Sequence, residues 1–200
     1  MYGTYRKLRF RRMLATGAAS LLFAAPTLAE ADSAGMMADT DRAGQIAPAP
    51  GSDESQTMQL VGKARLKVLL WSVYDSRLYT PTGRYDDGDR PLRLEIQYLR
   101  DIPARDLVDR TLVEWQAMGR NHPRQQQWLA ALEAMWPDIA ATDVLTLDLN
   151  TEGAAMFRHN GRSLGTIEDP AFGQEFVDIW LSRDCTRPEL RLALIGRDEG

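Results

Sequence analysis

Side chains that commonly act as nucleophiles or bases are few in this sequence of 200 residues, and they lie far apart along it. Cys185 is the only cysteine, and the only two histidines are His122 and His159. Neither histidine neighbours Cys185 in sequence, and a reactive thiol needs a nearby base or positive charge to lower its pKa. We therefore expect Cys185 to be a free, inert thiol and not a catalytic nucleophile.

Acidic side chains gather in one loop, between Pro81 and Pro91, which carries Asp86, Asp87 and Asp89 beside two glycines. Carboxylates of this kind can bind calcium, but a calcium loop spaces them regularly and closes with a bidentate Glu, and this loop does neither. We therefore expect an exposed turn here, with no metal, and we expect no cofactor. Gly-rich phosphate loops, HExxH and CxxC are absent from the sequence.

The most informative stretch for the fold is residues 159–182. Asn160-Gly161 favours the two positive φ values of a type I′ turn, so a hairpin is predicted between strands at 154–158 and 162–167. Asp169 and Pro170 then predict the start of a helix. Apolar residues recur along that helix with a period of three to four residues, which predicts that one face covers a sheet: Phe172, Phe176, Ile179 and Trp180.

The rest of residues 58–198 predicts a single domain of the α+β class. Residues 66–79 indicate two short strands, or one strand bent at Asp75-Ser76, and strict alternation predicts strands at 92–98 and 145–149. Helices are predicted to begin at three prolines: Pro103, Pro123 and Pro188. Strands joined by turns, with helices grouped between them, indicate an antiparallel sheet with helices packed on one face.

The first 57 residues do not show the pattern of a folded domain. Residues 1–31 combine a basic start, an apolar stretch and a small-residue site at Ala29-Glu30-Ala31, which is typical of a secretory signal peptide. A membrane anchor is the alternative, but the apolar run is shorter than the ~20 residues that span a bilayer. Residues 32–57 are rich in Ala, Gly, Pro and Ser and predict a disordered linker. We therefore expect a periplasmic or secreted protein without a stable membrane anchor after cleavage.

Charge excludes one class of partner. Removing residues 1–31 leaves 19 basic and 27 acidic residues, a formal charge of −8. A nucleic-acid-binding domain would need Lys and Arg clustered on one face, so no nucleic-acid partner is expected. The same acidic balance disfavours electrostatic docking to anionic lipid.

Three segments carry a resemblance to a known family. They are GKARLKVLLWSVYDSRLYT at 62–80, LEIQYLRDIPARDLVDRTLVEW at 94–115, and NGRSLGTIEDPAFGQEFVDIWLS at 160–182 followed by TRPELRLALIG at 186–196. In this order they resemble the exported bacterial branch of the chalcone isomerase-like family. The resemblance implies an open-faced β-sandwich, in which an antiparallel sheet has helices against one side and a pocket between the two layers.

The resemblance transfers the family's catalytic positions unevenly. Arg65 matches the substrate-positioning Arg of the first strand, and the Thr position falls on Tyr74. The Tyr position falls on Asp106 or Leu107, and the Asn position on Val113 or Glu114. Three of the four polar groups are therefore changed, and an apolar or acidic replacement cannot donate a hydrogen bond to a developing oxyanion. This argues against chalcone isomerase chemistry.

The resemblance leads to a binding hypothesis for a small apolar or carboxylate ligand, such as a fatty acid. Inside an apolar pocket Arg65 would offer a fork of donors to a carboxylate, while Tyr74 and Tyr98 could add hydroxyl donors. Alternatively, Arg65 is a solvated strand residue that shares a wet face with Lys67, and the tyrosines fill the core.

Two other classes of function stay open. One is an intramolecular lyase or isomerase with Arg65 as clamp and Tyr74 as hydroxyl donor. The other is a partner-binding module, for which a filled pocket and an exposed apolar patch are expected.

Overall fold

The structure is a computed structural model, and it describes residues 57–197. The predicted signal peptide and nearly all of the predicted linker lie outside the described residues. The elements follow one another in the order β1 (Gln59–Val68), β2 (Trp71–Thr80), β3 (Leu92–Tyr98), α1 (Ala104–Ala117), α2 (Gln125–Met135), β4 (Val144–Leu149), β5 (Ala155–His159), β6 (Arg162–Ile167), α3 (Pro170–Leu181) and α4 (Pro188–Leu194).

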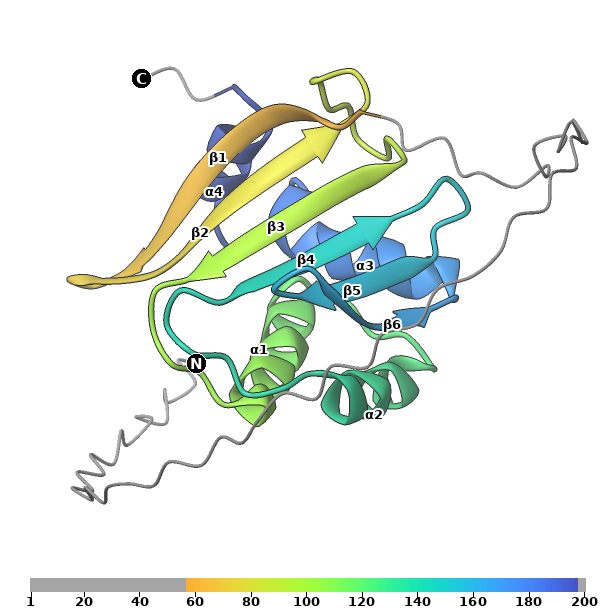
Figure 1. Ribbon diagram of the computed structural model, residues 1–200. Helices are drawn as coiled ribbons and strands as arrows, with labels where there is room; N and C mark the ends of the chain where they lie inside the picture. Colours follow the sequence, from red (N-terminus) through yellow and green to blue (C-terminus); the bar gives the residue numbers. More distant parts are fainter. Residues whose placement is uncertain (1–56, 198–200) are drawn as a thin grey trace, which may run out of the picture. The chain divides into compact units, whose positions relative to one another are not determined.

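The six strands form one antiparallel sheet in which each strand pairs with its neighbours in the chain. The four helices lie together on one face of this sheet (Figure 1). The α+β class and the open-faced sandwich predicted from the sequence are therefore confirmed. No helix among residues 57–197 is long and apolar enough to cross a membrane.

Local signals that the sequence carries explain most element boundaries. The turn between β5 and β6 is Asn160-Gly161, and both residues have positive φ as the hairpin turn requires. Asp169 caps α3, because its side chain accepts a hydrogen bond from the Ala171 amide at 3.1 Å. Gly119 has a φ of 69°, the left-handed conformation that commonly ends a helix.

One boundary differs from its prediction. The chain does not turn or bend at Asp75-Ser76; β2 runs straight through this dipeptide, and β1 begins earlier, at Gln59. The reversal lies instead at Leu69-Leu70. The turn escaped prediction because neither leucine is a turn-forming residue.

The inner face of the sheet is apolar and carries the core. One row of paired residues crosses all six strands: Gly62, Leu78, Leu94, Leu147, Phe157 and Gly165. The row ends in glycine on both edges because helices approach closely there. A Cβ on Gly62 would lie 2.3 Å from the Ala193 carbonyl oxygen of α4, and one on Gly165 would lie 3.1 Å from the Met135 methyl of α2.

The helices bury an aromatic cluster against this row. Trp115, Phe157 and Phe172 are fully buried, and the rings of Phe157 and Phe176 meet edge to face with centroids 5.3 Å apart. Such pairs add to the free energy gained from burial alone. Trp115 of α1, Trp128 of α2 and Trp136, directly after α2, are all buried and therefore serve packing, as their spacing predicts.

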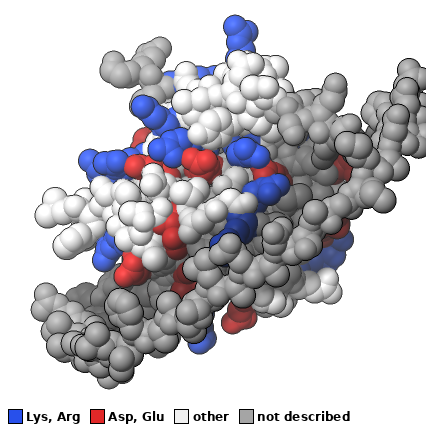
Figure 2. Space-filling model, in the orientation of Figure 1, with Lys and Arg blue, Asp and Glu red and all other residues white. Residues whose placement is uncertain are grey.

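The outer face of the sheet is covered by alternating charges (Figure 2). Asp148 on β4 binds Arg93 of β3 at 2.5 Å and Arg158 of β5 at 3.0 Å. Arg77 of β2 binds Glu95 of β3 at 2.8 Å. Cross-strand ion pairs thus give the sheet one solvated face, and the apolar site must be sought on the other.

Candidate ligand-binding site

A cleft on the inner face lies between the β1–β2 hairpin and helices α1, α3 and α4. Its volume is about 30 Å³. Nine residues line it: Leu66, Tyr74, Arg110, Glu114, Ile179, Trp180, Thr186, Arg187 and Leu190.

Tyr74 is the polar centre of this cleft. It lies on β2 opposite Leu66 of β1, and its hydroxyl oxygen accepts a hydrogen bond from Trp180 Nε1 at 2.9 Å. Burial raises the pKa of Tyr74 to about 12, although the Trp180 hydrogen bond opposes the shift. The hydroxyl is therefore protonated at neutral pH, and its own hydrogen is available to an acceptor in the cleft.

Tyr98 lies beside Tyr74 but does not line the cleft. The two residues are paired across β2 and β3, and their rings meet edge to face with centroids 6.0 Å apart. Tyr98 is 5% exposed, and burial raises its pKa. It belongs to the core and fixes the position of the Tyr74 ring.

Arg65 lies on the outer face, away from both tyrosines. It pairs with Asp75 across β1 and β2, and Arg65 Nε and Nη2 bind the two carboxylate oxygens at 2.5 Å and 2.7 Å. Its side chain is 53% exposed. The Arg65 guanidinium holds the pKa of Asp75 below its usual value. The three residues predicted from the sequence therefore do not form one site, and the geometry does not support a role for Arg65 inside the sheet–helix interface.

Arg187 provides a cation in the cleft that sequence reasoning missed. This residue directly precedes α4 and is half-buried. Its guanidinium forms no ion pair with any acidic residue between positions 57 and 197. Its place in the cleft follows from the packing of α4 on β1, and no local sequence signal reports that packing.

Glu114 is the acidic group of the cleft, and it already has two partners. It forms an ion pair with Arg110, one turn earlier on α1, and accepts a hydrogen bond from Thr186 Oγ1 at 2.5 Å. The Arg110–Glu114 pair is close to neutral as a unit. Arg187 therefore leaves the cleft with a net positive charge.

The remaining candidate nucleophile and bases are not assembled. Cys185 is buried, and burial raises its pKa. The ring of His122 stacks on Trp128 with centroids 4.4 Å apart, while His159 Nε2 lies 2.9 Å from Asp143. Each histidine therefore has a structural partner of its own.

One further sequence pattern, GRSLG at 161–165, has the GxSxG spacing of a hydrolase nucleophile. In those enzymes the Ser occupies a sharp turn between a strand and a helix. Here Ser163 is an exposed residue of β6, and in the part of the chain that the structure describes no hydrogen bond joins it to His159. The sequence therefore has the GxSxG spacing, but Ser163 does not lie on the strand-to-helix turn that a hydrolase nucleophile occupies.

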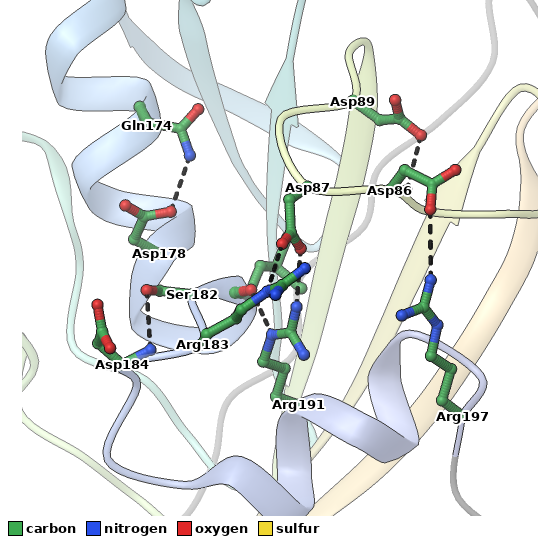
Figure 3. Close-up of polar contacts among 11 residues, drawn as sticks. Asp86, Asp87, Asp89, Gln174, Asp178, Ser182, Arg183, Asp184, Arg191 and Arg197 are labelled. Atoms are coloured by element: carbon green, nitrogen blue, oxygen red, sulfur yellow. Dashed lines mark hydrogen bonds and ion pairs between the residues drawn. The ribbon is translucent and has the colours of Figure 1, made fainter.

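The acidic loop at 81–91 is bound by arginines (Figure 3). Asp87 pairs with Arg183 at 2.8 Å and with Arg191 at 2.7 Å, and Asp86 pairs with Arg197 at 3.3 Å. Between residues 57 and 197, no three His, Cys, Asp or Glu side chains lie close enough to hold a metal ion. In this structure the loop binds the C-terminal segment through these ion pairs.

Comparison with known proteins agrees with this arrangement. The family model described as chalcone isomerase-like matches residues 40–196. The chain belongs to this family. A protein of Haemophilus influenzae is 28% identical over 139 residues, which cover 70% of this chain and 68% of that protein.

A solved structure with the same fold is a fatty-acid binding protein of Arabidopsis thaliana. It superposes with a TM-score of 0.57 at 11% identity, over 74% of this chain and 90% of that one. At this identity the likeness shows the chalcone isomerase-like fold and nothing more specific.

The positions that correspond to the catalytic residues of chalcone isomerase-like enzymes are scattered in this member. Asp106 and Val113 are exposed, and Leu107 is half-buried outside the cleft. Of the four transferred positions, only those at Tyr74 and Glu114 reach the cleft. These two positions supply one hydroxyl and one carboxylate, and a carboxylate cannot donate a hydrogen bond to a developing oxyanion.

Proposed function

We propose that this chalcone isomerase-like protein is a non-catalytic binder of a small apolar carboxylate, with a fatty acid as the leading example. The observation that carries the proposal is Arg187, a half-buried guanidinium without an acidic partner among residues 57–197, at a cleft walled by Leu66, Ile179 and Leu190. A guanidinium holds a carboxylate with paired, charge-assisted hydrogen bonds. The fatty-acid binding of the Arabidopsis structure supports the same ligand class.

Tyr74 would complete the head-group site. Its hydroxyl accepts from Trp180 and stays protonated, so it can donate to a carboxylate oxygen. Arg187, directly before α4, and Tyr74, on β2, both line the cleft. The carboxylate would lie between them, with its chain against the aliphatic residues.

The volume of the cleft sets a condition on binding. The cleft encloses about 30 Å³, whereas pockets for small ligands usually enclose roughly 300–1,000 Å³. An acyl chain must therefore displace the Trp180 indole or move α4 away from β1. We propose that α4, which has only seven residues, is the wall that moves.

The enzymatic alternative loses its main support in this structure. It required Arg65 and Tyr74 to act on one substrate, and they lie on opposite faces of the sheet.

The test is organic extraction of the purified protein followed by mass spectrometry. Wild type and Arg65→Ala are expected to release the same carboxylate, and Arg187→Ala to release at least tenfold less. Arg65→Ala is a matched control because it also removes one arginine guanidinium, but from the outer face of the sheet. Retention of the ligand by Arg187→Ala, or empty extracts from all three proteins, would contradict the proposal.

We propose further that the protein is exported and acts in the periplasm or outside the cell. The support is the basic, apolar and small-residue pattern of residues 1–31. Cell fractionation with intact-mass measurement tests it. A mature form that begins near Asp32 in the periplasmic fraction is expected, and an uncleaved chain in the cytoplasm would contradict it.

A further inference from the structure

The tip of the β1–β2 hairpin exposes apolar side chains to solvent. Val68, Leu69, Leu70 and Trp71 are 43%, 92%, 97% and 64% exposed, and they are consecutive. The hairpin extends beyond the other strands at the left of Figure 1, and the same region of Figure 2 is an uncharged projection with basic side chains beside it.

The backbone of this turn does not favour the residues that occupy it. Leu69 has a φ of 56°, in the left-handed region where Gly, Asn and Asp are the usual residues. A two-residue hairpin turn with one positive φ at its first position is normally Gly followed by a polar residue. Two leucines at these positions neither favour the backbone conformation of the turn nor increase the solubility of the protein. Local rules broken in this way mark a position selected for another property.

The charge around the tip is positive, although the chain as a whole is acidic. Residues 61–74 contain Lys63, Arg65 and Lys67 and no acidic residue. Arg65 is paired with Asp75, but neither lysine forms an ion pair with the residues at 57–197. Arg100 lies over the Trp71 ring, with its Cζ 5.3 Å from the centroid. Because salt screens charges beyond ~8 Å, a surface that meets this tip senses the local basic groups and not the net charge.

We propose that the hairpin tip docks reversibly on an anionic lipid membrane. Leucines would enter the outer hydrocarbon region, Trp71 would lie at the headgroup level, and Lys67, the lysine next to the tip, would meet the lipid phosphates. A second copy of the chain fits less well, since specific protein interfaces use about 20–30 residues a side, and the tip offers four.

Docking would place the ligand-binding cleft next to the membrane. Leu66, which pairs with Tyr74 in the cleft, lies two residues before Val68 on β1. Two residues span about 7 Å along a strand. An acyl chain could then pass between bilayer and cleft with little exposure to water. Only this consequence rests on the proposed ligand-binding function; docking itself depends on the tip alone.

Vesicle flotation of the purified protein tests docking. Wild type is expected to float with vesicles of phosphatidylglycerol and phosphatidylcholine, and at least tenfold less with phosphatidylcholine alone or in high salt. The double variant Leu69→Gly/Leu70→Asn is expected to lose at least tenfold in binding to the anionic vesicles. Val113→Gln, which removes a 48% exposed apolar side chain from α1, is the matched control and should bind as wild type does.

The turn variant also separates docking from folding. Gly-Asn suits the turn, so its thermal midpoint should equal or exceed that of wild type. Flotation of this variant at the wild-type level, or no flotation of wild type, would overturn the proposal. Loss of a dimer by the variant in sedimentation, without vesicle binding by wild type, would assign the tip to self-association and overturn it equally. Arg187→Ala should lose its ligand and still float, which keeps the two proposals distinguishable.

Discussion

At the scale of single residues, the Tyr74 hydroxyl is both a structural and a functional group. It satisfies the Trp180 indole N–H and faces the cleft. We predict that Tyr74→Phe lowers the free energy of unfolding by about 1–2 kcal/mol, because a half-buried donor loses its acceptor. Urea denaturation measures this, with Tyr79→Phe as a control whose ring lies on the outer face. Equal effects of the two substitutions would contradict the assignment.

The pKa of Tyr74 gives a prediction for alkaline pH. The native-state pKa of about 12 lies above the ordinary value of 10.0, so between these values the unfolded state has lost the proton that the native state keeps. The raised pKa of Tyr74 therefore stabilises the native state fully below pH 10. This stabilisation, up to about 2–3 kcal/mol of the free energy of unfolding, is lost as the pH rises towards 12. The free energy of unfolding should fall over this window in wild type and fall less steeply in Tyr74→Phe. Parallel slopes would show that Tyr74 is not the group involved.

At the scale of elements, the contact between β1 and α4 determines whether the cleft exists. Gly62 admits the α4 carbonyls of Ala193 and Leu194, to which a Cβ would lie at 2.3 Å and 2.5 Å. We predict that Gly62→Ala pushes α4 outward and costs about 1–3 kcal/mol of stability. Gly165→Ala should cost less, because it meets only the flexible end of Met135.

Hydrogen exchange resolves this prediction by region. In Gly62→Ala, amides of α4 should exchange faster while those of β3 and β4 remain protected. Uniform acceleration across the sheet, or equal effects of the two glycine substitutions, would mean that α4 is not a separately movable wall.

Elements were predictable from the sequence where their signal is local. Asn160-Gly161 and Asp169-Pro170 specify a turn and a helix start by their own backbone and capping preferences, so the hairpin turn and the start of α3 were predicted at the correct residues. β5 lies one residue later than its predicted range of 154–158. The Leu69-Leu70 turn was not predictable, because its residues contradict its backbone conformation. Alternation shows only that the residues of a strand divide between two faces of the sheet. Which face packs against the helices is decided by tertiary structure, so the sequence did not show on which face Arg65 lies.

At the scale of the whole molecule, the fold separates three surfaces with different chemistry. The outer face is solvated by cross-strand ion pairs, the inner face holds the core and the cleft, and the hairpin tip combines apolar and basic groups. The family and fold could be predicted from many positions together. The cleft could not, because Tyr74 comes from β2, Glu114 from α1 and Arg187 from the residue before α4, and they meet only through tertiary packing.

The measurement that tests the central claim most directly is the affinity of delipidated protein for decanoic acid and for decanol, followed by Trp fluorescence. These ligands share a chain and differ in the carboxylate. Wild type and Arg65→Ala are predicted to prefer the acid by about tenfold or more, as a charge-assisted hydrogen bond of roughly 1.5–3 kcal/mol implies. Arg187→Ala should bind both ligands with similar, weak affinity. Equal affinities in wild type, or a preference for the acid that survives in Arg187→Ala, would contradict the account of the cleft.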